Sequence, residues 1–296
     1  MKQGSGAAVD PHSERKTSQA AKVIDSLVET LRSLSPSKQA SVLERWPQIE
    51  AQIDGGLTVT ARSKKELRRL TRPQEPAMLN WLGTFEEGEV FYDVGANCGT
   101  ITLAAGAMHR ERITIVAVEP AYTNFESLVR NLSRNGLLRF TIPLQVALND
   151  RTGIERLNYY GSTDAGTALH AIGHPVDYEG NRFSPVEAQL MPAYALDDLV
   201  AVLKLPLPTR IKIDVDGHEG PLLRGAVDTL ARGSINELAI EIVDHDRQGT
   251  RLDAVKDLMR RYGYELVDAF RHGGEGSFVS DHLFRRRGWE PRSLSG

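Results

Sequence analysis

A glycine-rich stretch, residues 93–100, joins a predicted strand to a predicted helix through small side chains. Its sequence is Asp-Val-Gly-Ala-Asn-Cys-Gly-Thr. Small residues let the backbone turn tightly and approach a ligand, while the first N–H groups of the following helix point toward that ligand. Gly95 and Gly99 are spaced G-x-x-x-G rather than G-x-G-x-x-G, which weighs against a dinucleotide pyrophosphate.

Glu119 ends the next predicted strand, in the sequence Ala-Val-Glu-Pro. An acidic side chain at this position can accept hydrogen bonds from both hydroxyls of a ribose. Gly95 together with Glu119 therefore predicts a site for a nucleoside that has no dedicated phosphate cradle. S-adenosylmethionine is a nucleoside cofactor of this kind.

The segment after the fourth predicted strand carries polar groups that could act on an acceptor. A sulfonium is already a strong methyl donor, so a methyl-transfer site must align the acceptor and remove a proton if the acceptor is a hydroxyl. Asp214, Asp216 and His218 are the candidates for proton removal or acceptor binding. Asp216 could instead cap the following helix, and His218 could be purely structural.

One of these acids, Asp214, also suggests a metal site as an alternative, on the grounds of strand adjacency alone. Asp214, Glu241 and Asp244 end neighbouring strands and could gather around Mg²⁺, which prefers oxygen ligands. His245 and Asp246 are better explained as the solvated start of a loop. We expect no metal as the default, with Mg²⁺ as the possibility to test.

Composition and charge exclude several classes of protein. The chain has 296 residues, 41% hydrophobic and 25% charged, and a net charge of −3, so neither a disordered chain nor a general nucleic-acid binder is indicated. Its single cysteine, Cys98, cannot form an internal disulfide and has no predicted base beside it, which favours a small buried side chain. Without an apolar leader or an apolar run of membrane-spanning length, we expect a cytoplasmic protein with no membrane span.

Short β-branched runs alternate with helical patterns after Pro76, which predicts an α/β fold with a mainly parallel sheet, helices on both faces and an antiparallel terminal pair. The predicted strands are 89–94, 112–119, 141–148, 210–215 and 237–243, with the closing pair at 264–270 and 277–284. The predicted helices are 100–109, 122–135, 217–231 and 252–262.

The chain before this region differs in pattern. Residues 1–18 lack periodicity and are expected to be a disordered tail, residues 19–70 a helical extension, and residues 71–296 the main domain. One helix should start near Ala20, and a second at Pro36 with a kink at Pro47. Their apolar stripes should either pack on the main domain or bind a partner.

A long turn-rich stretch, residues 158–193, lies between the third and fourth predicted strands. Long loops in compact domains are often functional, and tyrosine and amide groups suit hydroxyl-rich substrates. Tyr159, Tyr160, Ser162 and residues 170–178 are therefore candidates for an acceptor pocket. A surface excursion or a small hairpin is the alternative.

Several ordered motifs between Trp81 and Arg286 together resemble the FkbM-type methyltransferases, a family within the class I S-adenosylmethionine-dependent enzymes. Asp216 stands where that family usually has glutamate, which is one methylene longer, and the residues before about 70 lie outside the resemblance. The motifs are Tyr-Asp-Val-Gly-Ala-Asn-Cys-Gly at 92–99, Val-Glu-Pro at 118–120 followed by Asn124, Asn131 and Asn135, Val-Ala-Leu-Asn-Asp at 146–150 with Gly153, Ala-Leu-Asp-Asp-Leu at 195–199, and the segment 212–226.

The resemblance implies a Rossmann-like class I fold and an S-adenosylmethionine site. It places Asp93, Gly95, Asn97 and Gly99 at the methionine end, although Asp93 could equally be a buried acid that holds the loop. It places Glu119 at the ribose. The full set of implied cofactor-binding residues is Asp93, Gly95, Ala96, Asn97, Gly99, Glu119, Asn124 and Ala147.

The expected function is O-methylation of a sugar, glycan or secondary-metabolite hydroxyl. The partner would be a small-molecule or glycan acceptor, with no nucleic acid, and the sequence leaves the oligomeric state open. Two alternatives remain at this point: an NAD-dependent oxidoreductase, which would use the same strand and acid, and a nucleoside-binding partner protein without catalysis.

Overall fold

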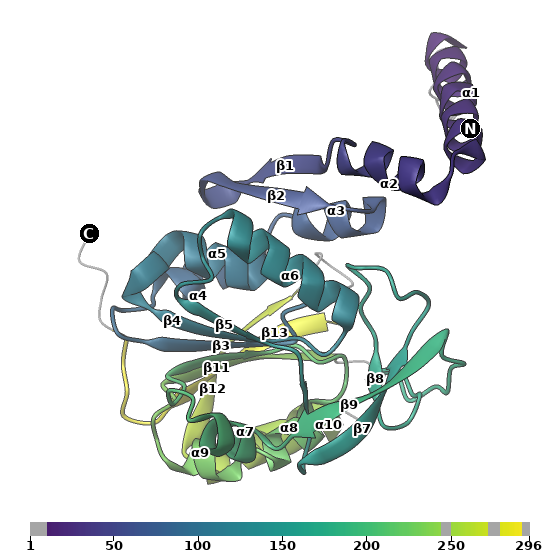
Figure 1. Ribbon diagram of the computed structural model, residues 1–296. Helices are drawn as coiled ribbons and strands as arrows, with labels where there is room; N and C mark the ends of the chain where they lie inside the picture. Colours follow the sequence, from purple (N-terminus) through teal and green to yellow (C-terminus); the bar gives the residue numbers. More distant parts are fainter. Residues whose placement is uncertain (1–10, 244–249, 272–278, 292–296) are drawn as a thin grey trace, which may run out of the picture. The chain divides into compact units, whose positions relative to one another are not determined.

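The computed structural model describes residues 11–243, 250–271 and 279–291, which belong to two compact units, Met1–Gln48 and Ile49–Gly296 (Figure 1). The division after Gln48 differs from the expected boundary near residue 70, because the segment 49–70 packs into the second unit. No helix among the described residues is long and apolar enough to cross a membrane.

The first unit contains two helices, α1 (Pro11–Ser33) and α2 (Pro36–Glu44). Residues 11–18 were expected in the disordered tail, but they are helical; proline is well suited to the first helical position because its missing N–H costs nothing there. Residues 1–10 lie outside the described residues. Pro47 follows α2 instead of kinking it, since a proline disfavours helical conformation in the residue before it. That the apolar stripe of α1 packs on the main domain stays a prediction.

A seven-stranded sheet forms the centre of the second unit, in the order β12-β13-β11-β10-β3-β4-β5. Neighbours from β11 to β5 are parallel, and β13 runs antiparallel to both β11 and β12, as the sequence predicted. The later strand of the closing pair, β13, therefore lies inside the sheet and β12 at its edge. The strands are β3 (Val90–Val94), β4 (Thr114–Val118), β5 (Thr141–Leu144), β10 (Arg210–Ile213), β11 (Glu237–Val243), β12 (Tyr264–Arg271) and β13 (Val279–Arg286).

Helices cover both faces of this sheet (Figure 1). Successive side chains of a strand point to opposite faces, and β3 follows this rule: Phe91 packs in one apolar cluster with α4, whereas Tyr92 and Val94 pack in another with α7, α8 and α10. The helices are α4 (Pro76–Gly83), α5 (Thr100–His109) and α6 (Tyr122–Arg134) on one side, and α7 (Leu196–Leu203), α8 (Glu219–Arg224), α9 (Val227–Ala231) and α10 (Thr250–Arg261) on the other. The helix predicted over 217–231 is interrupted at Gly225, because glycine is a weak helix former.

The predicted strand 141–148 is two strands in different sheets. The chain leaves the central sheet after β5, where Pro143 is tolerated because β5 is an edge strand. A second, four-stranded sheet then has the order β6-β9-β7-β8, so the stretch expected as a loop begins and ends in strands and contains the short strand β8. These strands are β6 (Ala147–Leu148), β7 (Gly153–Tyr159), β8 (Ala171–Ile172) and β9 (Glu187–Tyr194).

A buried ion cluster fixes the strand starts, opposite the end where the parallel strands finish. Arg210, at the start of β10, is fully buried and pairs with Glu89 at 2.9 Å and with Glu237 at the start of β11. The indole Nε1 of Trp81 on α4 also donates to Glu237, at 2.9 Å. Burying a charge is costly unless it is paired, so these contacts define the register of β10 against its neighbours.

A hairpin and a short helix that the sequence analysis did not predict precede the sheet. The strands β1 (Ile49–Ile53) and β2 (Leu57–Ala61) are joined by a 3-10 turn at Asp54–Gly56, and α3 (Lys64–Leu70) follows. Asn131 on α6 accepts a hydrogen bond from the Thr60 N–H at 2.7 Å and donates to the Thr60 carbonyl at 3.2 Å. Asn135 does the same for Thr58, at 3.0 and 2.9 Å. The amides of Asn131 on α6 and of Asn135, the residue that follows the helix, thus satisfy the edge of β2 as another strand would.

We expect Asn131→Ala to lower the free energy of unfolding by about 2 to 3 kcal/mol, because it leaves the buried N–H and carbonyl of Thr60 unsatisfied. Urea unfolding measures the loss, and amide hydrogen exchange at Thr60 should accelerate with it. Ser133→Ala, at an exposed position on the same helix, is the matched control. Unchanged exchange at Thr60 in Asn131→Ala would contradict the role given to this side chain.

Candidate active site

A cavity of about 380 Å³ opens where the parallel strands of the central sheet end. Its wall combines the loop after β3, the ends of β4, β10 and β11, strand β6 and the segment before β8. Eight of the eleven residues predicted from the sequence line it: Gly95, Asn97, Glu119, Asn124, Ala147, Asp214, Asp216 and His218.

The loop after β3 approaches β10 so closely that only glycine fits. Gly95 has a φ of +84°, and a Cβ placed on it would lie 1.7 Å from the carbonyl oxygen of Asp214. The N–H groups of Gly95 and Ala96 both donate to the carbonyl of Val118, at 2.9 and 3.0 Å. These contacts bring the ends of β3, β4 and β10 together, so that the side chains following them share one cavity.

Glu119 lies at the end of β4, almost fully buried, and is held by three protein donors. Its carboxylate accepts hydrogen bonds from the N–H of Asn97 (2.8 Å), the N–H of Ala121 (2.9 Å) and the Asn124 amide (3.3 Å). A carboxylate offers about four lone-pair sites, which leaves about one for a ligand hydroxyl. Burial nevertheless raises the pKa of Glu119 to about 7.

Three predicted cofactor residues are not part of the cavity wall. Ala96 is buried in the apolar core, and Gly99 lies against Leu128. Both residues shape the loop. Asp93 is 2% exposed and accepts a 2.5 Å hydrogen bond from the Thr102 hydroxyl on α5. Of the two interpretations of Asp93, this geometry favours the buried acid that holds the loop.

Cys98 is fully buried, and burial raises the pKa of its thiol to about 12. A thiol in that environment is a poor nucleophile.

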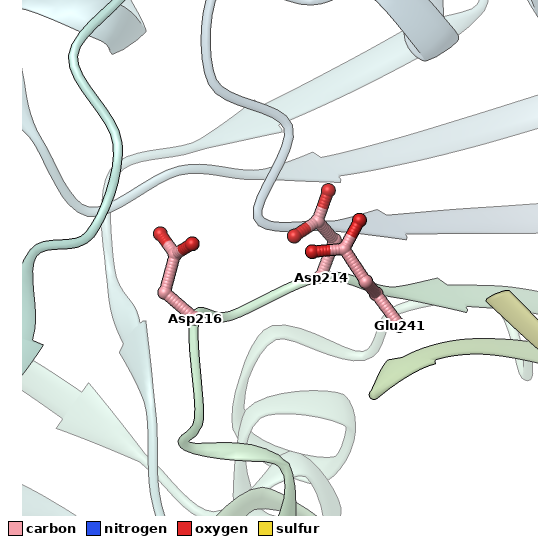
Figure 2. Close-up of side chains that lie close together, drawn as sticks. All are labelled: Asp214, Asp216 and Glu241. Atoms are coloured by element: carbon pink, nitrogen blue, oxygen red, sulfur yellow. The ribbon is translucent and has the colours of Figure 1, made fainter. Parts of the chain in front are cut away.

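The acids at the ends of β10 and β11 form a compact cluster. Oxygens of Asp214, Asp216 and Glu241 all lie within 4.8 Å of one another (Figure 2). Burial, and then the charge of Asp214, raises the pKa of Glu241 to about 9 and that of Asp216 to about 7. Of the three expected magnesium ligands, Asp244 lies outside the described residues. In the observed cluster, the third acid beside Asp214 and Glu241 is Asp216. The cluster can hold either protons or a hard cation.

Lys212 is the buried counter-charge to this cluster, and the sequence analysis gave it no role. Its ammonium lies 3.2 Å from Asp214 and 3.6 Å from Asp281 on β13. Burial alone would lower the pKa of Lys212, but the surrounding carboxylates outweigh that effect and raise it, so the side chain stays charged. A lysine in the middle of a buried strand was the available sequence signal.

Asp216 has an unusual backbone conformation, with a φ of +52°. Residues other than glycine rarely adopt this region, although aspartate and asparagine tolerate it best, and such strain concentrates at functional sites. Its carboxylate accepts a 2.7 Å hydrogen bond from the N–H of Leu169. Its side chain therefore links the end of β10 to the segment before β8 rather than capping the next helix.

His218 also lines the cavity, and its hydrogen bonding defines its tautomer. Its Nε2 lies 3.2 Å from Oδ1 of Asn149, and that oxygen already accepts the N–H of Asp150 at 2.8 Å. Nε2 therefore donates, which leaves the lone pair on Nδ1. Burial lowers the pKa of His218, so the ring is neutral near pH 7.

The segment 164–170 closes one side of the cavity, and we call it the strap. The Thr167 carbonyl accepts hydrogen bonds from the amides of Asn97 and Asn124, both at 3.0 Å, and the N–H of Gly166 donates to Asn124 at 2.8 Å. Thr167, Ala168 and His170 of the strap line the cavity.

Only part of the predicted acceptor stretch therefore reaches the cavity. Tyr159 is buried beneath it, with its ring 4.8 Å from that of His170, and Tyr160 is exposed. Neither these tyrosines nor Ser162 is among the residues that line this cavity.

Two further lining residues, Arg69 and Arg72, were missed by sequence reasoning. They belong to the segment around α3, which precedes every recognisable motif, so only the tertiary fold brings them here.

The titration of Asp216 should be visible in the stability of the protein. Its usual pKa is 3.8 and its folded pKa is about 7, so its contribution is fully present below the lower value and is lost as pH rises through the higher one. Between about pH 5 and pH 8, the free energy of unfolding of the wild type should fall by about 2 to 3 kcal/mol more than that of Asp216→Asn. Asparagine tolerates the backbone and can still accept the Leu169 N–H.

Urea unfolding at a series of pH values measures this difference. Asp228→Asn, at an exposed position on α9, should keep the wild-type dependence. Identical curves for wild type and Asp216→Asn would show that the carboxyl is not buried in the way described.

Comparison with known proteins gives a consistent result. A family model described as the methyltransferase FkbM domain matches residues 93–266. The chain is 28% identical over 201 residues to the hexuronic acid methyltransferase AglP of Haloferax volcanii, covering 67% of this chain and 75% of that protein. It is 27% identical over 199 residues to the 31-O-demethyl-FK506 methyltransferase FkbM of Streptomyces tacrolimicus, covering 61% and 74%. The solved structure of precorrin-6y C5,15-methyltransferase from Geobacter metallireducens aligns with a TM-score of 0.43 at 15% identity, covering 78% and 93%.

The family model spans more than half of the chain and includes the loop after β3, Glu119, the end of β10 and the acids beyond it. It confirms the resemblance, the class I fold and S-adenosylmethionine as methyl donor, and it gives no support to an NAD-dependent oxidoreductase or a non-catalytic binding protein. The chain belongs to the FkbM family and is an S-adenosylmethionine-dependent methyltransferase.

Proposed function

We propose that this methyltransferase transfers the methyl group to a hydroxyl of a sugar, a glycan or a secondary metabolite. The observation that carries the proposal is a single cavity with the buried carboxylate of Glu119 in one part of its wall and a cluster of carboxylates at the ends of β10 and β11 in another. The two relatives named above, a hexuronic acid methyltransferase and a 31-O-demethyl-FK506 methyltransferase, support this acceptor class.

The wall of the cavity fits S-adenosylmethionine, group by group. Glu119 has an acceptor position left for a ribose hydroxyl, and the apolar side chains Val118, Leu148 and Leu157 offer a surface for a flat base. The carboxylates of Asp214 and Asp216 suit the positive charges of an ammonium and a sulfonium. The bound cofactor would supply an activated methyl group, so this chain's own residues must orient the acceptor and take up its proton.

Asp216 is the side chain best suited to take up that proton. Its pKa of about 7 lies close to working pH, which is where a general base is most effective. It lines the cavity, and the hydrogen bond to Leu169 holds its carboxylate in place. Asp214 is paired with Lys212, and Glu241 retains its proton to higher pH, so both are less suited than Asp216 to deprotonating the acceptor.

We expect Glu119→Gln to weaken binding of S-adenosylmethionine by about 1.5 to 3 kcal/mol, which is about 10- to 150-fold, because it removes a charge-assisted hydrogen bond to the ribose. Isothermal titration calorimetry measures the affinity, and circular dichroism verifies folding. Glu111→Gln, at an exposed position just before β4, is the control. Wild-type affinity in a folded Glu119→Gln variant would remove Glu119 from the ribose site.

We expect Asp216→Asn to lower kcat for a hydroxyl acceptor by about 100-fold or more, the usual contribution of a general base. The wild-type kcat should rise with pH through about 7 as Asp216 ionises, and the variant should lose this rise. Methyl transfer to a panel of hexuronic acids and macrolide alcohols provides the assay, and calorimetry with S-adenosylmethionine separates the loss of kcat from any weaker binding of the cofactor. A variant that keeps the wild-type pH profile would assign proton removal to another group.

A further inference from the structure

The charges on the cavity wall are unevenly distributed. Four carboxylates line it, from Glu119, Asp214, Asp216 and Glu241. The two histidines in the wall are neutral near pH 7, since burial lowers the pKa of His170 to about 4 and also that of His218. Among the described lining residues, the fixed positive charges are those of Arg69 and Arg72.

Both arginines come from the segment that precedes the family match. Arg69 is in the last turn of α3 and is half-buried, and Arg72 lies two residues beyond the helix and is exposed. Both line the main cavity and also a smaller adjoining hollow of about 90 Å³, which Lys212 and Asp281 line as well. Within the described part of the chain, neither guanidinium forms an ion pair within 4.0 Å.

The helix that carries Arg69 is firmly held. Glu66 is buried, forms an ion pair with Arg130 on α6 and accepts the N–H of Arg62 at 2.6 Å. The Ser63 hydroxyl caps the helix by accepting the N–H of Glu66 at 3.1 Å. Because the buried charge of Glu66 is paired with Arg130, α3 is fixed in position rather than loosely attached to the surface.

The strap packs on the same helix. Lys65 donates to the Thr167 hydroxyl at 3.2 Å. A Cβ placed on Gly166 would lie 3.2 Å from the Cβ of Arg69, so strap and helix are in close contact at this point. The strap is in turn bound to Asn97, Asn124 and Asp216 of the cavity wall. The position of Arg69 is thus coupled, through the strap, to the loop after β3 that lines the cavity.

We infer that Arg69 and Arg72 form a carboxylate-binding site in this cavity, supplied by the N-terminal segment. A ligand carboxylate would be repelled by the ionised acids at the ends of β4 and β10, whereas a pair of guanidinium groups can bind it through several charge-assisted hydrogen bonds. This inference rests on the proposed function, because it concerns the ligands of the same cavity.

Two ligands could supply the carboxylate: the methionine end of S-adenosylmethionine, or an acidic acceptor such as a hexuronic acid. If the methionine end of the cofactor binds here, its ammonium would face the acids and its carboxylate would face the arginines. With an acidic acceptor, the arginines would select it over a neutral sugar. The chemistry of recognition is the same for both ligands.

Calorimetry on the full-length protein separates these sources. The cofactor probes are S-adenosylhomocysteine and 5′-methylthioadenosine, which lacks the amino-acid end. The acceptor probes are methyl glucuronide and methyl glucoside, each measured in the presence of saturating S-adenosylhomocysteine. The variants are Arg69→Gln, Arg72→Gln and the double substitution. Arg68→Gln, an exposed arginine on the same helix, is the matched control and should bind every probe as the wild type does.

At least about tenfold weaker binding of S-adenosylhomocysteine, with methylthioadenosine unchanged, would place the cofactor carboxylate on these arginines. Unchanged S-adenosylhomocysteine with a similar loss for methyl glucuronide, and none for methyl glucoside, would place the acceptor carboxylate there. Changes below twofold for every probe in the double variant would overturn the inference. A wild-type protein that binds neither adenosyl compound would instead contradict the cofactor site itself.

Discussion

The contact between Gly95 and the backbone of Asp214 is the constraint on which the site depends. A side chain at position 95 would overlap the Asp214 carbonyl, so the absence of a Cβ allows the loop after β3 to lie against the end of β10. The same loop is bound to the end of β4 through Val118. Three strand ends are thereby held within the span of one ligand. Glu119, Asp214 and Asp216 line one cavity as a result, although 97 positions in the sequence separate Glu119 from Asp216.

Buried charge is concentrated at both ends of the central sheet, with different consequences. At the strand starts, Arg210 is matched by Glu89 and Glu237, which gives a paired cluster suited to fixing register. At the strand ends, the carboxylates outnumber Lys212, and burial, followed by the charge of Asp214, raises the pKa values of Glu241 and Asp216. The first arrangement stabilises the fold, whereas the second costs stability at neutral pH and is the type of environment that tunes acids and bases for catalysis.

The segment 49–72 is structurally part of the methyltransferase unit, although it precedes the family match. Asn131 of α6 and Asn135 just after it satisfy the edge of β2, and Arg130 on the same helix pairs with Glu66. One helix of the central fold thus binds both the hairpin and α3. Through α3 the segment reaches the cavity wall, so an element outside the shared motifs adds the positive charge that the shared part of the cavity lacks.

The sequence by itself determined the alternation of strands and helices, the antiparallel closing pair, the family and most of the cavity wall, because these follow from local periodicity and from motifs such as those around Gly95 and Glu119. It failed for β1, β2 and the sheet formed by β6 to β9, whose strands are stabilised by their pairing partners rather than by a strong local pattern. Only the tertiary structure decided that Asp93 and Gly99 lie behind the cavity wall, that Asp216 joins Asp214 and Glu241, and that Arg69 and Arg72 face the same cavity. Proximity between residues far apart in sequence is a property of packing, and one sequence without its fold carries no direct record of it.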